Sequence, residues 1–125
     1  MIDGCQYGEL SILDSLFPPN IKQYYVVDVG AADGIDNSNS YELLQRDGLR
    51  GLLTEPHPGY FMDLLKLYTD NPRVKLSNYA IADTVSRRRL WLDDQCSSLI
   101  YQKSISIEVQ CVTLTELCML YNVPH

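Results

Sequence analysis

The fold is decided by Tyr24–Gly34, whose sequence reads Tyr-Tyr-Val-Val-Asp-Val-Gly-Ala-Ala-Asp-Gly. Its first half is an apolar run of strand length, rich in β-branched and aromatic side chains, and glycines end it abruptly. Gly30 and Gly34 allow positive φ and close approach of a ligand to the backbone. A strand, a loop of small residues and a following helix form the usual nucleotide-binding opening of an open α/β sheet.

Asp28 lies inside the apolar run, where a carboxylate is costly unless something binds it. Two interpretations stay open at this point. The carboxylate binds a ligand held by the loop, or it belongs to a plain turn between strand and helix and binds loop amides or caps the next helix. Glycine motifs of this kind also occur without a ligand.

The length and charge of the chain limit its class. Its 125 residues are enough for one domain, with residues 1–23 as a lead-in that contains a short helix and residues 24–125 as the domain itself. A formal net charge of −6 would repel a phosphate backbone, so we expect no nucleic-acid binding driven by general electrostatics. No apolar run reaches the length of a membrane span, so no membrane partner is expected.

The cysteines point to a reducing compartment. They are widely spaced and form no C-x-x-C pair, so the spacing predicts neither a metal site nor a disulfide framework. The N-terminus lacks the charged and apolar regions of a signal peptide. We therefore expect a cytoplasmic protein without a bound metal.

A doubly wound α/β sheet is expected because three strands alternate with two helices. In chain order the expected elements are the strand Tyr24–Gly30, a helix through Tyr41–Leu44, the strand Leu49–Glu55, the helix Tyr60–Tyr68 and the strand Val74–Tyr79. The crossover between the first two strands has βαβ length, so these strands should be parallel.

The ends of the first helix are expected from local signals. Asn39 with Glu42 fits a capping arrangement. The helix should end near Asp47-Gly48, with Gly48 at the C′ position.

The pattern changes in the last third of the chain. Arg87–Leu92 and Ser104–Cys111 are expected to be two strands that pair with each other, the second of them half buried because apolar and polar residues alternate. Thr113 and Glu116 form a capping box at the start of a final amphipathic helix.

Polar side chains follow all three expected parallel strands. Asp28, Glu55 and Asn78 lie at the carboxyl ends, the edge where open α/β sheets bind ligands. Glu55 is placed to accept both hydroxyls of a ribose, or alternatively to cap the helix that starts near Pro58. Asn78 could bond an adenine edge or satisfy turn backbone. His57 is expected to be a plain loop histidine, with a role in proton transfer as the alternative.

The order of acidic residues and glycines in the loop favours one class of nucleoside ligand over another. A site for a nicotinamide dinucleotide typically has the motif G-x-G-x-x-G and binds the pyrophosphate at a helix N-terminus. This loop instead has an acid, Asp28, two residues before its first glycine. That carboxylate would oppose a pyrophosphate but suits an ammonium group. A ligand that carries both an amino-acid ammonium and a ribose is S-adenosylmethionine.

Several blocks of the sequence resemble the FkbM-type methyltransferases, which are S-adenosylmethionine-dependent enzymes with a Rossmann-like fold. The blocks are Val26–Ile35, Ser38-Asn39, Gly51–Pro56, Pro72-Arg73-Val74 and Asn78–Ile81. The resemblance covers residues 24–122. The general methyltransferase pattern has a second glycine where this chain has Ala32.

The resemblance implies roles for individual residues. The methionine part of the cofactor would be held by Asp28, Gly30, Ala31 and Gly34, with Asp33 lining the loop. Glu55 would bind the ribose, and Asn78 with Ala80 would form the adenine side. The reaction implied is O-methylation of a sugar or other small hydroxylated metabolite, with a small molecule or glycan as acceptor. The sequence identifies no catalytic base.

The resemblance also implies that the fold is truncated after its first half. In the family the helix at Thr113–Tyr121 is followed by a strand with an acidic motif and by further elements. That strand would pair with Tyr24–Gly30, so an open sheet edge available for self-association is expected. Cofactor binding is then expected to be weak and turnover absent in this chain.

Two rival functions remain. One is a catalytically inactive, methyltransferase-like remnant that serves as an interaction or assembly module. The other is a nicotinamide-dependent oxidoreductase, which the spelling of the loop disfavours.

Overall fold

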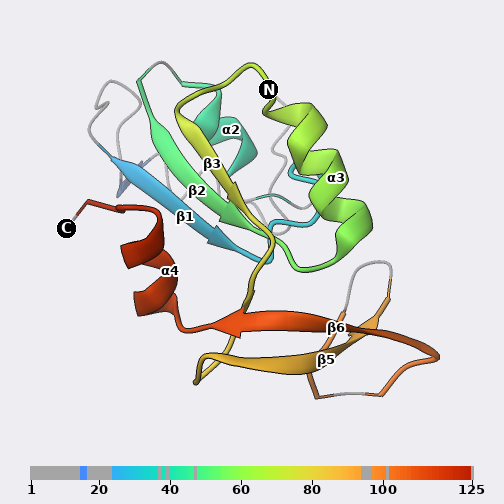
Figure 1. Cartoon of the computed structure of the whole chain (residues 1–125). Coiled ribbons are helices and arrows are strands. Elements are labelled where there is room, and N and C mark those ends of the chain that lie inside the picture. The colour runs from blue at the N-terminus through green and yellow to red at the C-terminus, as the bar shows by residue number, and fades with distance from the viewer. Residues whose placement is uncertain are drawn as a thin grey trace.

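The computed structural model describes residues 15–16, 24–36, 38, 40–46, 48–93, 97–100 and 102–124 (Figure 1). The expected cap at Asn39 and most of the expected helix in residues 1–23 lie outside the described residues. Within the described ranges, no helix is long and apolar enough to cross a membrane.

The main sheet contains the three strands expected from the sequence. β1 (Tyr25–Val29), β2 (Arg50–Thr54) and β3 (Val74–Ser77) are parallel and lie in the order β1-β2-β3. The register places Asp28 beside Leu53 and Val29 beside Thr54, so the carboxyl ends of the first two strands lie level. The prediction of parallel neighbouring strands is confirmed.

Helices cover both faces of this sheet (Figure 1). On one face α2 (Tyr41–Leu44) and α3 (Pro58–Leu67) enclose a core that includes Leu53 and Leu64, both fully buried. On the other face α4 (Leu114–Leu120) packs its buried Leu117 against Leu52 of β2. The consecutive β2 residues Leu52 and Leu53 thus point into two different cores, which is why both are apolar. The α/β class with helices on both faces is confirmed.

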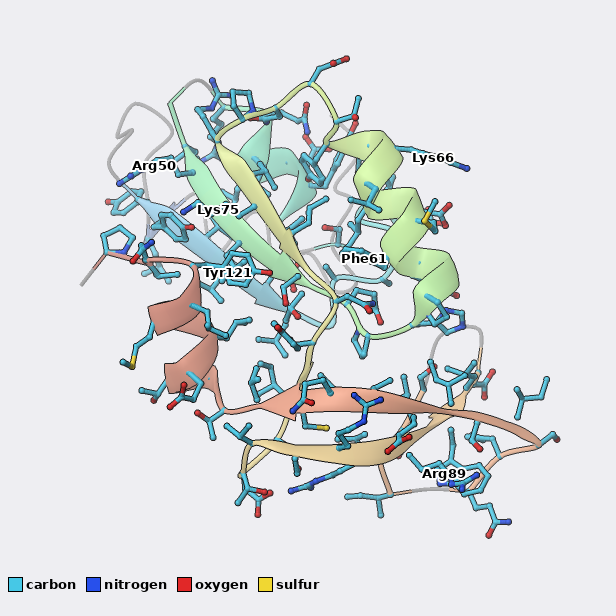
Figure 2. The ribbon with its side chains drawn as sticks, viewed as in Figure 1. Arg50, Phe61, Lys66, Lys75, Arg89 and Tyr121 are labelled. Carbon is cyan, nitrogen blue, oxygen red and sulfur yellow. The ribbon has the colours of Figure 1, made fainter. Side chains whose placement is uncertain are left out.

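α4 is capped at its start and bonded to the main sheet just beyond its end. The Thr113 hydroxyl accepts a hydrogen bond from the Glu116 amide at 3.1 Å, as the capping box predicted. Beyond the helix, the Lys75 ammonium of β3 donates to the Tyr121 carbonyl at 2.8 Å (Figure 2). This helix therefore closes the second face of the sheet.

The prediction for the end of the α2 helix was wrong. α2 ends at Leu44, with Gln45 as its C-cap, so Gly48 does not occupy the C′ position. Gly48 has φ +81° in the turn that leads to β2, and the Leu49 amide bonds to the Arg46 carbonyl in that turn. The glycine signal was real, but it marks this turn and not the helix terminus.

The expected strand Val74–Tyr79 is divided into two elements. β3 ends at Ser77, and after two residues β4 (Ala80–Ile81) joins another sheet. The Ser77 hydroxyl accepts from the Tyr79 amide at 3.2 Å, and the Tyr79 carbonyl accepts from the Thr54 hydroxyl at 2.6 Å. These side-chain bonds replace the ladder at the point where the chain leaves the main sheet.

The second sheet has the order β4-β6-β5 and lies beyond the carboxyl ends of the main strands (Figure 1). β5 (Ser86–Leu92) and β6 (Ile105–Val112) pair antiparallel, as expected from the sequence. β4 adds to β6 in parallel. The inward side chains form a separate small core, which contains Ala80, Leu90, Val109 and Cys111.

The glycine loop after β1 is built from left-handed backbone. Gly30 has φ +75° and Gly34 has φ +84°, and Ala32 between them has φ +52°. An L-residue costs about 1–2 kcal/mol in this region, so Ala32 is strained where glycine would be relaxed. This is the position at which the general methyltransferase pattern has its second glycine.

The two glycines should differ when each is changed to alanine. At Gly30 an added Cβ meets no atom within 4 Å, whereas at Gly34 it would lie 2.6 Å from Leu64 Cδ2. Gly30→Ala should lower the free energy of unfolding by about 1–2 kcal/mol through backbone strain alone. Gly34→Ala should cost a further amount of about 1–3 kcal/mol through overpacking. Urea unfolding of both variants tests this, and equal losses would contradict the packing argument.

Candidate functional site

Glu55 links the glycine loop to the next helix. It follows β2 directly and its residue is only 6% exposed. Oε1 accepts from the Ala32 amide and Oε2 from the His57 amide, each at 2.8 Å. A buried carboxylate needs such donors. Glu55 therefore caps α3, as one of its two predicted roles requires, by accepting the bond from His57, the N-cap residue. The same carboxylate also holds the glycine loop through the Ala32 amide.

Two backbone bonds strengthen the same junction. The amides of Gly30 and Ala31 both donate to the Thr54 carbonyl, at 2.9 and 3.2 Å. Ala31 is buried at 4% exposure and belongs to the core beneath the loop. The first half of the loop is thus folded over the carboxyl end of β2.

Asp33 closes the second half of the loop. Its Oδ1 accepts from the amides of Ile35 and Asp36, both at 2.9 Å. This is the turn-forming role typical of aspartate. Gly34 then brings the backbone against α3, where no side chain fits.

Asn78 joins the third strand tip to the second. Its Nδ2 donates to the Glu55 carbonyl at 3.1 Å and lies 3.5 Å from the Pro56 carbonyl. The amide group thus satisfies backbone, one of the two roles expected for it, and Asn78 remains exposed. Ala80 points elsewhere, since its side chain lies in the core of the second sheet.

Asp28 binds the start of α2. Its Oδ2 accepts from the Ser40 hydroxyl at 2.6 Å, and Ser40 is 1% exposed. Ser38 supports the arrangement, because its hydroxyl accepts from the Tyr41 amide at 3.0 Å. Burial raises the pKa of Asp28, and the bond from Ser40 offsets part of that rise. Charging this carboxyl is therefore costly in the ligand-free protein.

The two acids lie on the same face of the sheet. Asp28 is beside Leu53 in the register, and Glu55 follows Leu53 by two residues. Side chains two apart in a strand point to the same side, so both acids lie on the side of α2 and α3. The structure brings together Asp28, Glu55, Asn78 and the glycine loop at one edge of the sheet.

His57 has a structural role in this arrangement. It is the N-cap of α3, its Nδ1 accepts from the Gly59 amide at 3.1 Å, and its ring centroid lies 4.7 Å from that of Tyr60. The prediction of a loop histidine is thus confirmed with an added capping function.

A hollow of about 380 Å³ lies beside the glycine loop, between the loop and α3. It is lined by Asp33, Ile35, Asp63, Lys66 and Leu67, and so it does not include Asp28, Glu55 or Asn78. Among the described residues, no group of histidine, cysteine, aspartate and glutamate side chains could hold a metal ion.

Sequence reasoning missed two residues of the site. Ser40 bonds the half-buried Asp28, and Tyr68 lies 5% exposed in the core next to the loop. The sequence predicts Asn39 as the cap of the first helix and Tyr68 only as the last residue of an expected helix. Neither role is readable before the helices are placed against β1.

Comparisons with known proteins supply no family for this site. No model of a protein family, no curated protein and no solved structure matches the chain. The resemblance found in the sequence therefore depends on the residues that carry it, and the function must be argued from their chemistry.

The raised pKa of Asp28 predicts a pH-dependent gain for Asp28→Asn. A carboxyl that holds its proton more tightly when folded makes the free energy of unfolding fall as pH rises from 3.8 through its folded-state pKa. The asparagine cannot ionise, so the variant should become progressively more stable than the wild type across that window and keep the gain at neutral pH. Urea unfolding between about pH 3.5 and about pH 7 measures this. A difference that does not change with pH would refute it.

Proposed function

We propose that this chain binds S-adenosylmethionine at the carboxyl ends of its parallel strands, as the cofactor-binding part of an FkbM-type methyltransferase. The observation that carries the proposal is a pair of acids, the half-buried Asp28 and the buried Glu55, on one face of neighbouring strand ends with a glycine loop between them. Ordinary globular cores leave such positions apolar, and buried carboxylates are kept where they bind something.

Asp28 suits the ammonium group of the cofactor. Its pKa is raised by burial, and a cation against the free side of the carboxylate would remove that penalty. Ser40 bonds Oδ2, and among the described residues no other donor binds this carboxylate, so Oδ1 would be the atom for the ligand. The unfavourable desolvation of the ionised Asp28 carboxylate would be offset when the ammonium group binds, which favours binding.

Glu55 can serve a ribose without releasing the loop. Each of its oxygens accepts one backbone amide, whereas a carboxylate offers about four acceptor sites. Two ribose hydroxyls can therefore donate to a group that is already held in place. The amide bonds fix its orientation before the ligand binds.

Catalysis in this proposal is mainly positioning. When bound, S-adenosylmethionine supplies a sulfonium methyl group for in-line attack by a hydroxyl of a sugar or small metabolite. The strand tips hold the two ends of the cofactor, and the glycine loop lets its backbone approach closely. A base is required only to take up the hydroxyl proton.

Isothermal titration with S-adenosylmethionine tests the proposal. Asp28→Asn and Glu55→Gln each remove a charge-assisted hydrogen bond of about 1.5–3 kcal/mol, so each should weaken binding roughly tenfold to 150-fold. Asp70→Asn is the matched control, because Asp70 is exposed in the turn after α3 and should leave affinity unchanged. Melting temperatures establish that all three variants fold.

Two outcomes would reject the assignment. One is wild-type affinity in both site variants. The other is tighter binding of NAD than of S-adenosylmethionine by the wild-type protein, which would favour a nicotinamide-dependent oxidoreductase.

A second candidate function is self-association as an assembly module. Among the described residues β1 pairs only with β2, which leaves its other edge open. Val29 at the end of β1 is 49% exposed, and Met119 and Leu120 on α4 are 67% and 57% exposed. Open edges with apolar surroundings favour pairing with a second copy of the chain.

A charge on the open edge should abolish such association. Val29→Lys places a lysine where edge strands use it to block pairing. Val85→Lys is the control, because Val85 is similarly exposed, at 58%, in the turn before β5. Sedimentation velocity over a concentration series should show association in the wild type and the control but not in Val29→Lys. A wild type that stays monomeric at all concentrations would exclude this function.

A further inference from the structure

The backbone of β1 turns alternate residues toward β2 and toward the edge that no described strand covers. The Gly30 amide donates to the last carbonyl of β2 at 2.9 Å. The Val26 carbonyl also faces β2, at 3.2 Å from the position that a Cβ on Gly51 would take. Because the direction of the polar groups alternates along a strand, the residues between these two-residue steps face outward. The outward residues are Tyr25, Val27 and Val29.

This open edge is complementary to a second copy of itself. A two-fold axis through Val27, perpendicular to the sheet, lays two β1 strands antiparallel, with Val27 opposite Val27 and Tyr25 opposite Val29 of the other copy. In that register each outward amide meets an outward carbonyl. A shift by one residue would set outward groups against residues whose polar groups face β2, and a shift by two would shorten the overlap.

The same axis places the α4 helices of both copies on one face. The side chain of Tyr25 packs in the core that contains Leu117 of α4, so Val27 and Val29 project on that face as well. A two-fold axis perpendicular to a sheet does not exchange its faces. The two α4 helices would therefore be neighbours above the junction of the β1 strands.

α4 offers an apolar surface for this contact. A hollow of about 720 Å³ runs along the helix and the segment after it, and its apolar lining consists of Leu114, Cys118, Met119, Val123 and Pro124. The side chains of Leu114 and Met119 are 47% and 67% exposed. Two short strands pair only marginally in water, so burial of this surface would supply the stabilisation that the strand junction lacks.

Charge is distributed in the sense that antiparallel pairing requires. Arg50 and Arg73 lie at the amino ends of β2 and β3, and the Arg50 guanidinium is 5.5 Å from the centroid of the Tyr25 ring (Figure 2). Asp33 and Asp36 lie in the loop beyond the carboxyl end of β1. The two-fold axis sets the basic end of each copy beside the acidic end of the other, which favours the pairing.

We propose that two copies of this chain join through antiparallel β1 strands centred on Val27. The product is one continuous sheet of order β3-β2-β1-β1-β2-β3, with both α4 helices on the same face. This inference rests on the self-association proposed above, to which it adds the strand register and the symmetry. The two proposed cofactor sites would lie at opposite ends of the joined sheet.

Amide hydrogen exchange of the wild-type protein tests the junction residue by residue. The amides of Val26 and Asp28 face β2 in the monomer and in the dimer, whereas those of Tyr25, Val27 and Val29 would be bonded only in the dimer. Raising the protein concentration through the association range should slow exchange of the outward amides by about tenfold or more, and that of the inward amides far less. Sedimentation velocity defines that range.

A charge exchange at Val27 tests the symmetry. Val27→Lys and Val27→Glu each set like charges opposite each other, so each alone should raise the dissociation constant of the dimer at least about tenfold. An equimolar mixture should restore association, because lysine then faces glutamate. Val29→Lys mixed with Val29→Glu is the matched control and should not associate, because Val29 faces Tyr25 of the other copy. Melting temperatures establish that the variants fold.

The outcomes separate self-association from this particular junction. If the wild type stays monomeric at all concentrations, self-association fails and this inference fails with it. If the wild type associates while exchange of the outward amides is unchanged, or is already slow in the monomer, only the β1 junction is rejected. Equal restoration by the Val29 mixture would reject the register. If the Val27 variants do not fold, the exchange measurement on the wild type decides.

Discussion

The two hydrogen bonds accepted by the Glu55 carboxylate hold the carboxyl edge of the sheet together. One fixes the Ala32 amide of the loop after β1, and the other fixes the His57 amide at the start of α3. The loop needs this support, because Ala32 has φ +52° and would otherwise relax away from its left-handed conformation. A buried carboxylate in turn needs those amides. Loop, strand end and helix start therefore depend on one side chain.

The site contrasts with the cores on either side of it. Leu52, Leu53, Leu64 and Leu117 are fully buried and satisfy only packing. The half-buried Asp28 and the buried Tyr68 hydroxyl lack that benefit, since partial or full removal from water raises the pKa of both groups. Stability is commonly sacrificed where a ligand must bind. The position of these groups beneath the glycine loop is what makes this contrast informative about function.

The sequence predicted those parts of the fold that depend on local pattern. β1 and β2 are apolar runs with a βαβ crossover between them, and Thr113 with Glu116 is a local cap, so these could be read directly. The break between β3 and β4 could not, because the hydroxyl of Thr54, far away in the chain, binds the carbonyl of Tyr79 there. The structural roles of Ser40 and Tyr68 could not be predicted from the sequence for the same reason. Their roles arise only when α2 and α3 are packed against β1.

The structure also changes how the two readings of Glu55 relate to each other. From the sequence, capping of α3 and binding of a ribose appeared as alternatives for one carboxylate. The amide bonds show that the local role is filled by one acceptor site on each oxygen. The remaining acceptor sites are then oriented by the backbone itself, without the entropy that a free glutamate would lose on binding. The bonds from the Ala32 and His57 amides would therefore hold Glu55 in the orientation that ribose binding needs. The two roles predicted for Glu55 are then compatible, and the first would support the second.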